Sequence, residues 1–247
     1  MKRSDISIER LEALESGLVE TTTLVENLSI NFSKLIQQGL PHISKEIAQY
    51  IDNDAGITAR MVKVGQLLYQ YDKSDDFLKI LQNHSSDTIR GFGCYYIAAD
   101  PALSLEQRLN LIKPFINDHH FGVREWSWLA LRPYMIDEPE KTLSLLQPWT
   151  QSTSAYIRRF TTEATRPRGV WTTHFSYFKD DPQKGLPLLE PLKADDTRYV
   201  QDSVANWLND AAKTHGDWVK NLTKRWLNES DCKATHYICK RALRSLK

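Results

Sequence analysis

The segment from Tyr156 to Trp171 gathers the residue types that could do chemistry. It holds four arginines, one glutamate and one tryptophan within sixteen residues. At helical period, Arg159, Glu163 and Arg166 share one face, because residues three and four apart are neighbours on a helix. The apolar residues form another stripe, made of Ile157, Phe160 and Ala164. The charged face is either a solvated ladder of salt bridges or part of a binding site.

Pro167 ends this predicted helix, because its ring clashes with the preceding turn and it has no N–H to donate. Residues 168–171 are therefore a loop or the entry to another helix. Trp171 lies in that segment, near the charged face. Tryptophan is often buried, but the loop position favours an exposed indole.

Carboxylates beside aromatic rings are suited to stabilising a cation. A carboxylate supplies Coulomb attraction, and an indole face supplies a cation–π attraction of about 0.5–2 kcal/mol. Arginines and backbone N–H groups beside them are suited to phosphate. The combination favours a ligand with an anionic backbone and a cationic or electron-poor base. The alternative is a protein-interaction surface.

Helix pairs at a regular spacing must position these residues. Apolar–Arg pairs recur 34 residues apart at Ile89-Arg90, Val123-Arg124 and Ile157-Arg158. Two repeats also close alike, with Ala130-Leu-Arg-Pro133 and Ala164-Thr-Arg-Pro167. A fourth copy, Tyr199-Val-Gln201, follows after an insertion that we place at residues 168–178, and a fainter fifth begins near Thr235. This period predicts an all-α protein, an α-solenoid of HEAT-like helix pairs in one domain over residues 1–247.

The apolar periodicity predicts the individual helices. The early ones are expected at 6–16, 24–38, 41–51 and 57–71, and the second helices of the later pairs at 105–116, 139–147, 182–193 and 217–226. In the repeat register, Glu125, Arg159 and Asp202 occupy equivalent positions on the concave helices. Ser203, Asn206 and Asp210 share a polar face of the fourth such helix. Carboxylates, guanidiniums and tryptophans therefore meet in the middle of the array.

Composition excludes several classes of protein. The net charge of +1 argues against a uniformly basic nucleic-acid binder, although a local patch is compatible with it. We expect no transmembrane helix and no signal peptide. Three scattered cysteines favour a reducing cytoplasm. His119-His120 has no third ligand nearby, so no metal site is expected, and no Gly-rich phosphate loop or serine-hydrolase motif occurs.

Two long motifs resemble one family. These are Tyr156–Trp171, with its Arg-Arg-Phe-Thr-Thr-Glu-Ala-Thr-Arg-Pro-Arg core, and Tyr199–Asp210, with Ser-Val-Ala-Asn-Trp-Leu-Asn-Asp. Shorter matches occur at Phe121–Glu125, Leu131–Tyr134 and Gly17–Leu28. The chain resembles, over nearly its whole length, the AlkC-type branch of the AlkC/AlkD DNA glycosylases, which are HEAT-like alkylation-repair enzymes.

The resemblance implies hydrolysis of the N-glycosidic bond of alkylated, cationic bases such as 3-methyladenine in double-stranded DNA, by a monomer without cofactor or metal. A cationic base is already a good leaving group, so the enzyme mainly stabilises an oxocarbenium-like sugar and positions a water. Members of this superfamily are thought to work without burying a flipped base.

The resemblance also implies roles for individual residues. Asp210 matches the carboxylate that stabilises the sugar and holds the water, Glu125 and Glu163 line the same pocket, and Trp171 stacks or makes a cation–π contact. Arg159 grips a phosphate or orients Glu163. The other candidates for DNA contact are Arg124, Arg158, Arg166 and Arg168.

The chain departs from the family pattern at three places. Gln201-Asp202 replaces an Arg-Arg pair, which removes two positive charges and would weaken the hold on DNA. Gly169-Val170 replaces Leu-Pro before Trp171, and we expect no appended β-sandwich of the kind that some members carry. Asp210 could instead neutralise Lys213, and Glu163 could only pair with arginines. The alternatives are therefore a non-catalytic module that binds damaged or branched DNA, and a protein-interaction scaffold.

Overall fold

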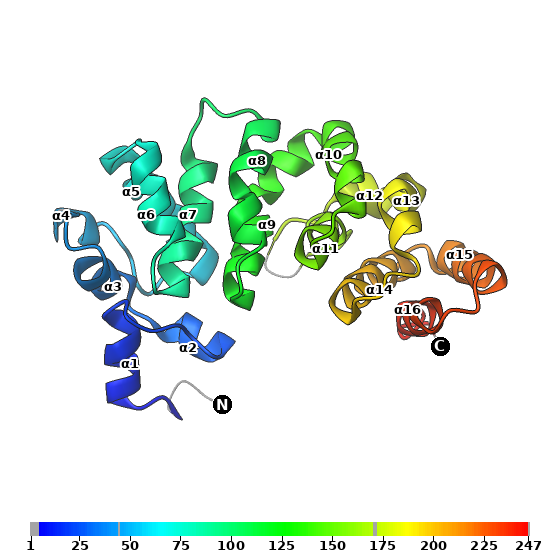
Figure 1. Ribbon diagram of the computed structural model, residues 1–247, viewed down its shortest axis with the longest axis horizontal. Coiled ribbons are helices and arrows are strands. Elements are labelled where there is room, and N and C mark those ends of the chain that lie inside the picture. Colours follow the sequence, from blue (N-terminus) through cyan, green and yellow to red (C-terminus); the bar gives the residue numbers. More distant parts are fainter. Residues whose placement is uncertain (1–4, 44, 170–171, 247) are drawn as a thin grey trace. The chain divides into compact units, whose positions relative to one another are not determined.

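The computed structural model describes residues 5–43, 45–169 and 172–246, as Figure 1 shows. The chain forms two compact units, Met1–Leu131 and Arg132–Lys247, and the division falls inside one helix, α9 (Phe121–Asp137). That residues 1–247 form a single domain stays a prediction.

Unit 1 is built around α7 (Asp87–Ala99), whose residues are buried from Asp87 to Ala98. The surrounding helices are α1 (Ile8–Glu15), α2 (Leu24–Ser29), α3 (Phe32–Gly39), α4 (Lys45–Ala48), α5 (Ile57–Tyr71), α6 (Asp75–Gln82), α8 (Leu105–Ile116) and the first part of α9. α7 packs against α5, α6 and α8. α5 and α7 approach closely at Gly65, where a Cβ atom would lie 2.5 Å from the backbone of Tyr95. Only glycine fits that position.

The predicted helices 57–71 and 105–116 have the bounds of α5 and α8. The prediction of one helix over 24–38 is wrong, because the chain breaks at Ile30 and restarts as α3. Asn31 causes the restart, since its side chain accepts a hydrogen bond from the N–H of Lys34 and caps α3. The predicted helix 41–51 is reduced to α4, and Ile43 closes a turn onto Leu40 instead.

Unit 2 is built around α14 (Arg198–Ala212), which packs against α11 (Ala155–Glu163), α15 (Gly216–Glu229) and α16 (Lys233–Ala242). The other elements are the end of α9, α10 (Pro139–Leu146), η2 (Gln147–Gln151), α12 (Ser176–Asp180), η3 (Pro182–Gly185), α13 (Leu186–Leu189) and η4 (Glu190–Leu192). The predicted helix 182–193 is broken into η3, α13 and η4. Each of these pieces begins with a proline in its first two positions, and proline has no N–H to continue a helix.

The apolar–Arg repeat has a structural cause. Each arginine donates through Nη1 to the carbonyls five and six residues earlier: Arg90 to His84 and Ser85, Arg124 to Asp118 and His119, and Arg158 to Ser152 and Thr153. These carbonyls belong to the connection before the helix, where no helical partner exists. The arginine satisfies them.

Gln201 occupies the same position in the fourth copy. Its Nε2 donates to the carbonyl of Asp195, also six residues earlier, at 2.8 Å, and the residue is 6% exposed. The arginine that the family places here would therefore face the preceding connection. Of the two arginines that Gln201 and Asp202 replace, the one at position 202 therefore matters more for the positive charge near Asp210.

The all-α class of repeated helix pairs predicted from the sequence is confirmed within each unit, and the described residues contain no β-strand. None of the helices described is both long and apolar enough to cross a membrane.

Candidate active site

Arg166 joins two carboxylates that come from different helices of unit 2. Its Nη1 lies 2.9 Å from Oε1 of Glu163, the last residue of α11, and its Nε lies 2.8 Å from Oδ2 of Asp210 on α14. Arg166 follows the end of α11, just before Pro167. The two carboxylates raise the pKa of the Arg166 guanidinium, against the opposing effect of burial. The structure thus brings together three of the residues singled out in the sequence.

Glu163 is held by hydrogen bonds and by two arginines. Its Oε2 accepts a hydrogen bond of 2.8 Å from the hydroxyl of Ser203 and lies 3.5 Å from Nη2 of Arg159. The hydroxyl of Thr162 donates in turn to Ser203 at 2.9 Å. Burial alone would raise the pKa of Glu163, but Arg159 and Arg166 keep it below the ordinary value. Glu163 is therefore a buried, ionised carboxylate.

Asp210 lies just under the surface. The residue is 3% exposed, and its second oxygen, Oδ1, is 3.2 Å from Nζ of Lys213. The Lys213 side chain is 47% exposed, so this ion pair is open to solvent on one side. One oxygen of Asp210 is thus held by the half-buried guanidinium of Arg166 and the other by the more exposed ammonium of Lys213.

The Tyr199 side of α14 carries further cations. The guanidinium of Arg159 lies 4.2 Å from the ring centroid of Tyr199, and that of Arg198 lies 3.4 Å from the ring centroid of Tyr237 on α16. Arg244 donates to Asn206 at 2.9 Å. It makes no ion pair with the described residues. These side chains line a surface where guanidiniums are held in place by rings and amides.

Asp202 is the exception on this surface. Its Oδ1 accepts a hydrogen bond of 2.6 Å from the hydroxyl of Tyr237 and lies 3.4 Å from Nε of Arg241. The side chain is 38% exposed. It offsets one of the positive charges of α16.

The remaining predicted DNA contacts of unit 2 have different surroundings. Arg158 is engaged by two carbonyls and by Asp195, whose Oδ2 lies 2.6 Å from Nε of Arg158. The Nε atom of Arg168 is buried and has no hydrogen-bond partner among the described residues. Trp171 lies outside the described residues. The roles assigned to these three residues stay predictions.

Glu125 and Arg124 lie in unit 1. Oε2 of Glu125 accepts a hydrogen bond of 2.8 Å from the indole N–H of Trp128. Arg124 donates to the two carbonyls of its connection. Their predicted roles in catalysis and DNA contact stay predictions.

One buried guanidinium of unit 2, that of Arg132, was not predicted from the sequence as part of the site. Arg132 is 0% exposed, and it donates to the carbonyls of Ala164 and Arg166, both at 2.7 Å, and of Thr173 at 3.2 Å. Burial, together with the positive charge of the neighbouring Arg166, lowers its pKa to about 10. The repeated Ala-x-Arg-Pro motif could have indicated its importance, because the motif places Arg132 at the position that Arg166 occupies in the next repeat.

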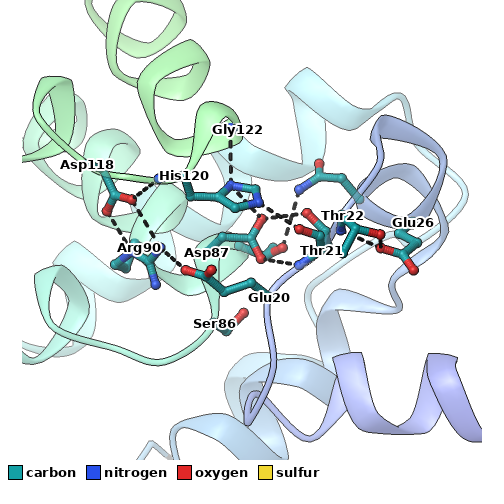
Figure 2. A network of polar contacts seen from close by, with 12 residues as sticks. Glu20, Thr21, Thr22, Glu26, Ser86, Asp87, Arg90, Asp118, His120 and Gly122 are labelled. Atoms are coloured by element: carbon teal, nitrogen blue, oxygen red, sulfur yellow. Dashed lines mark hydrogen bonds and ion pairs between the residues drawn. The ribbon is translucent and has the colours of Figure 1, made fainter. Parts of the chain in front are cut away.

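A second polar network lies in unit 1, where it ties the segment 20–22 to α7 and α9 (Figure 2). Asp87 accepts hydrogen bonds from the N–H and the hydroxyl of Thr21, both at 2.8 Å, and Nε2 of His120 contacts the Thr21 carbonyl at 2.7 Å. Arg90 pairs with Asp118 and Glu20. His120 thus packs against the Thr21 segment, while the exposed His119 contacts Glu20 through Nε2 at 2.7 Å. No cluster of potential metal ligands occurs among the described residues.

The cysteines form no disulfide in the described part of the chain. Cys94 and Cys239 are buried thiols, and Cys232 is partly exposed at the start of α16.

Comparisons with known proteins identify relatives of this chain. The uncharacterized protein YhaZ of Bacillus subtilis is 36% identical over 120 residues, which cover 49% of this chain and 33% of YhaZ. The structure of Pseudomonas fluorescens alkylpurine DNA glycosylase AlkC, bound to DNA containing an abasic site analogue, is 25% identical with a TM-score of 0.66, covering 99% of this chain and 64% of that one. The chain thus spans less than two thirds of both proteins.

AlkD2 from Streptococcus mutans shares the fold at 20% identity, with a TM-score of 0.63 over 81% of this chain and 97% of that one. The model of the DNA alkylation repair enzyme family matches residues 101–246, more than half of the chain. The match includes α11, α14 and the Glu163–Arg166–Asp210 cluster. The resemblance seen in the sequence is confirmed, and the chain belongs to the DNA alkylation repair enzyme family.

Proposed function

We propose that this chain is a DNA glycosylase that hydrolyses the N-glycosidic bond of alkylated, cationic bases of the 3-methyladenine type in double-stranded DNA. The observation that carries the proposal is Asp210, a nearly buried carboxylate with one oxygen fixed by Arg166 and the other held by an exposed lysine. The family supports the same reaction class.

The chemistry requires little acid catalysis. When the C1′–N bond breaks, its electron pair neutralises the cationic base, and positive charge develops on the sugar. A fixed carboxylate stabilises that charge more strongly in a site without water than in bulk solvent. Water then attacks C1′ and passes a proton to Asp210 or to solvent. Asp210 thus stabilises the transition state and orients the nucleophile.

Lys213 gives access to the carboxylate. Lys213 is the exposed partner of this part-buried ion pair, so a DNA phosphate is able to compete with Asp210 for its ammonium. Movement of the lysine to the phosphate frees Oδ1 of Asp210, while Oδ2 stays on Arg166. Glu163 keeps Arg166 in place through the other side of the guanidinium.

The surface along α14 and α16 would hold the DNA backbone. Arg159, Arg198 and Arg244 are the cations best placed for phosphates, because rings or amides fix them and they lie beside the carboxylates.

Base release from methylated duplex DNA tests the proposal. We expect Asp210→Asn to lower single-turnover release of 3-methyladenine by about 100-fold or more, the scale of losing one transition-state contact. Asp202→Asn is the matched control, since it removes an exposed carboxylate from the same helix and should change release by less than about threefold.

Each other outcome has a meaning. Equal release by wild type and Asp210→Asn would move the chemistry to Glu163 or Glu125. A folded wild type that binds DNA without releasing base would instead support a non-catalytic module for damaged or branched DNA.

A further inference from the structure

We propose that Arg132 is a positioning residue of this site, which holds the main chain around Arg166 so that one guanidinium reaches both carboxylates. The inference rests on the proposed function. Arg132 touches neither substrate nor reacting atoms, and it acts through Arg166.

The hydrogen bonds described for Arg132 reach the segment that follows α11. Nη1 donates to the carbonyl of Ala164, Nη2 to that of Arg166, and Nε to that of Thr173. The guanidinium also lies 5.5 Å from the ring centroid of Phe175. All three nitrogens therefore donate to carbonyls that lie beyond Glu163, the last residue of α11.

The carbonyls that follow α11 need hydrogen-bond donors from elsewhere in the chain. The carbonyls at the end of a helix lack intrahelical partners, and Pro167 prevents the helix from continuing. Arg132 supplies the missing donors for Ala164 and Arg166. Its Nε donates to the carbonyl of Thr173, further along the chain.

The geometry of Arg166 depends on this anchor. The carbonyl that Arg132 holds at 2.7 Å belongs to Arg166 itself, whose side chain makes the 2.8 Å and 2.9 Å contacts with Asp210 and Glu163. A displacement of the main chain by about 1 Å would break one of them, and errors of that size cost about 100-fold in rate. A lysine cannot replace this function, because a single ammonium does not reproduce a planar fork on three carbonyls.

Arg108 of unit 1 provides a matched control. It is 3% exposed and donates to the carbonyls of Ile97, Ala98 and Asp100 at the end of α7. It thus makes the same kind of contact in a part of the chain that holds neither Glu163 nor Asp210. Substitutions at 108 report the general cost of losing a buried guanidinium.

The experiment compares Arg132→Lys with Arg108→Lys in the full chain. We expect both to lower the melting temperature, but only Arg132→Lys to reduce the rate of 3-methyladenine release, by about 30-fold or more, with the Kd for methylated duplex within about twofold of wild type. The Arg166 Nε–H resonance should also shift in Arg132→Lys and stay in place in Arg108→Lys.

A reduced rate in both variants, or in neither, would overturn the positioning role. If Arg132→Lys does not fold, Arg132→Gln decides instead, because its amide keeps fewer than three donors for the carbonyls of Ala164, Arg166 and Thr173. An unchanged Arg166 resonance and rate in that variant would refute the inference. A folded wild type that releases no base overturns the proposed function, and the positioning role with it.

Discussion

Glu163 carries a negative charge in the interior of unit 2, with Arg159, Arg166 and Ser203 around it. Desolvation opposes the charged form, and the two arginines outweigh it, so the pKa lies below the ordinary value of 4.5. The folded state therefore binds this proton less readily than the unfolded chain. The stabilisation is fully present above about pH 4.5 and is lost as the pH falls through the folded value.

Glu163→Gln should remove this pH dependence. At pH 7 we expect the variant to be less stable by about 3–5 kcal/mol, because the largely buried guanidiniums of Arg159 and Arg166 lose the carboxylate between them. The difference between wild type and variant should shrink as the pH falls from 6 to 3, since the wild-type carboxylate becomes protonated. Urea denaturation at several pH values measures it. A difference that stays constant with pH would mean that Glu163 is not ionised in the fold.

The sequence alone indicated that Arg159, Glu163 and Arg166 share a face, and the structure places them within contact of one another. The Arg132 anchor could not be predicted in the same way. Arg132 and Arg166 occupy the same place in two similar motifs, yet α9 continues through Pro133 to Asp137 while α11 ends before Pro167. Whether a proline interrupts a helix depends on the packing around it, which no local pattern contains.

At the scale of the helix, neighbouring arginines of α11 serve different purposes. Arg158 points back to its own connection and to Asp195. Arg159 points to Glu163 and the Tyr199 ring. The repeat period predicted α11 and its apolar–Arg start. It did not separate the structural arginine from the one that we propose contacts DNA, because both have the same type and adjacent positions.

Substitution of each arginine should separate these two purposes. We expect Arg158→Gln to lower the free energy of unfolding by about 2–4 kcal/mol, since a largely buried pair is broken, with DNA affinity little changed. Arg159→Gln should raise the Kd for duplex DNA about fivefold, the loss of about 1 kcal/mol. Denaturation and fluorescence anisotropy measure the two quantities. If Arg158→Gln is fully folded and still binds DNA more weakly than wild type, Arg158 belongs to the DNA-binding surface.

The whole molecule has a net charge of only +1, yet the proposed function requires a polyanionic partner. A small net charge is compatible with such a partner when the cations are grouped locally, as Arg159, Arg198 and Arg244 are along α14 and α16 of unit 2. At this scale the helical class was predictable from the repeat period, and the family from the two long motifs. The division into two compact units was not, because it falls inside the continuous helix α9.

DNA affinity should therefore depend steeply on salt despite the small net charge. Each phosphate neutralised by a cation contributes about −0.9 to the slope of log K against log salt. Three to four such contacts predict a slope of about −3, which Arg244→Gln should reduce by about 1. Titrations between 50 and 200 mM salt measure it. A slope near zero would leave the protein-scaffold alternative standing.

The recurring Ala-x-Arg position limits how far this chain can be redesigned by making its repeats alike. At 132 the arginine is buried on three carbonyls, and at 166 it bridges two carboxylates. In Ala242-Leu-Arg244, a third copy of the motif, the arginine is exposed and donates to an amide. A consensus repeat would average these surroundings, and averaging often stabilises a fold. It would also erase the partners that distinguish the three arginines.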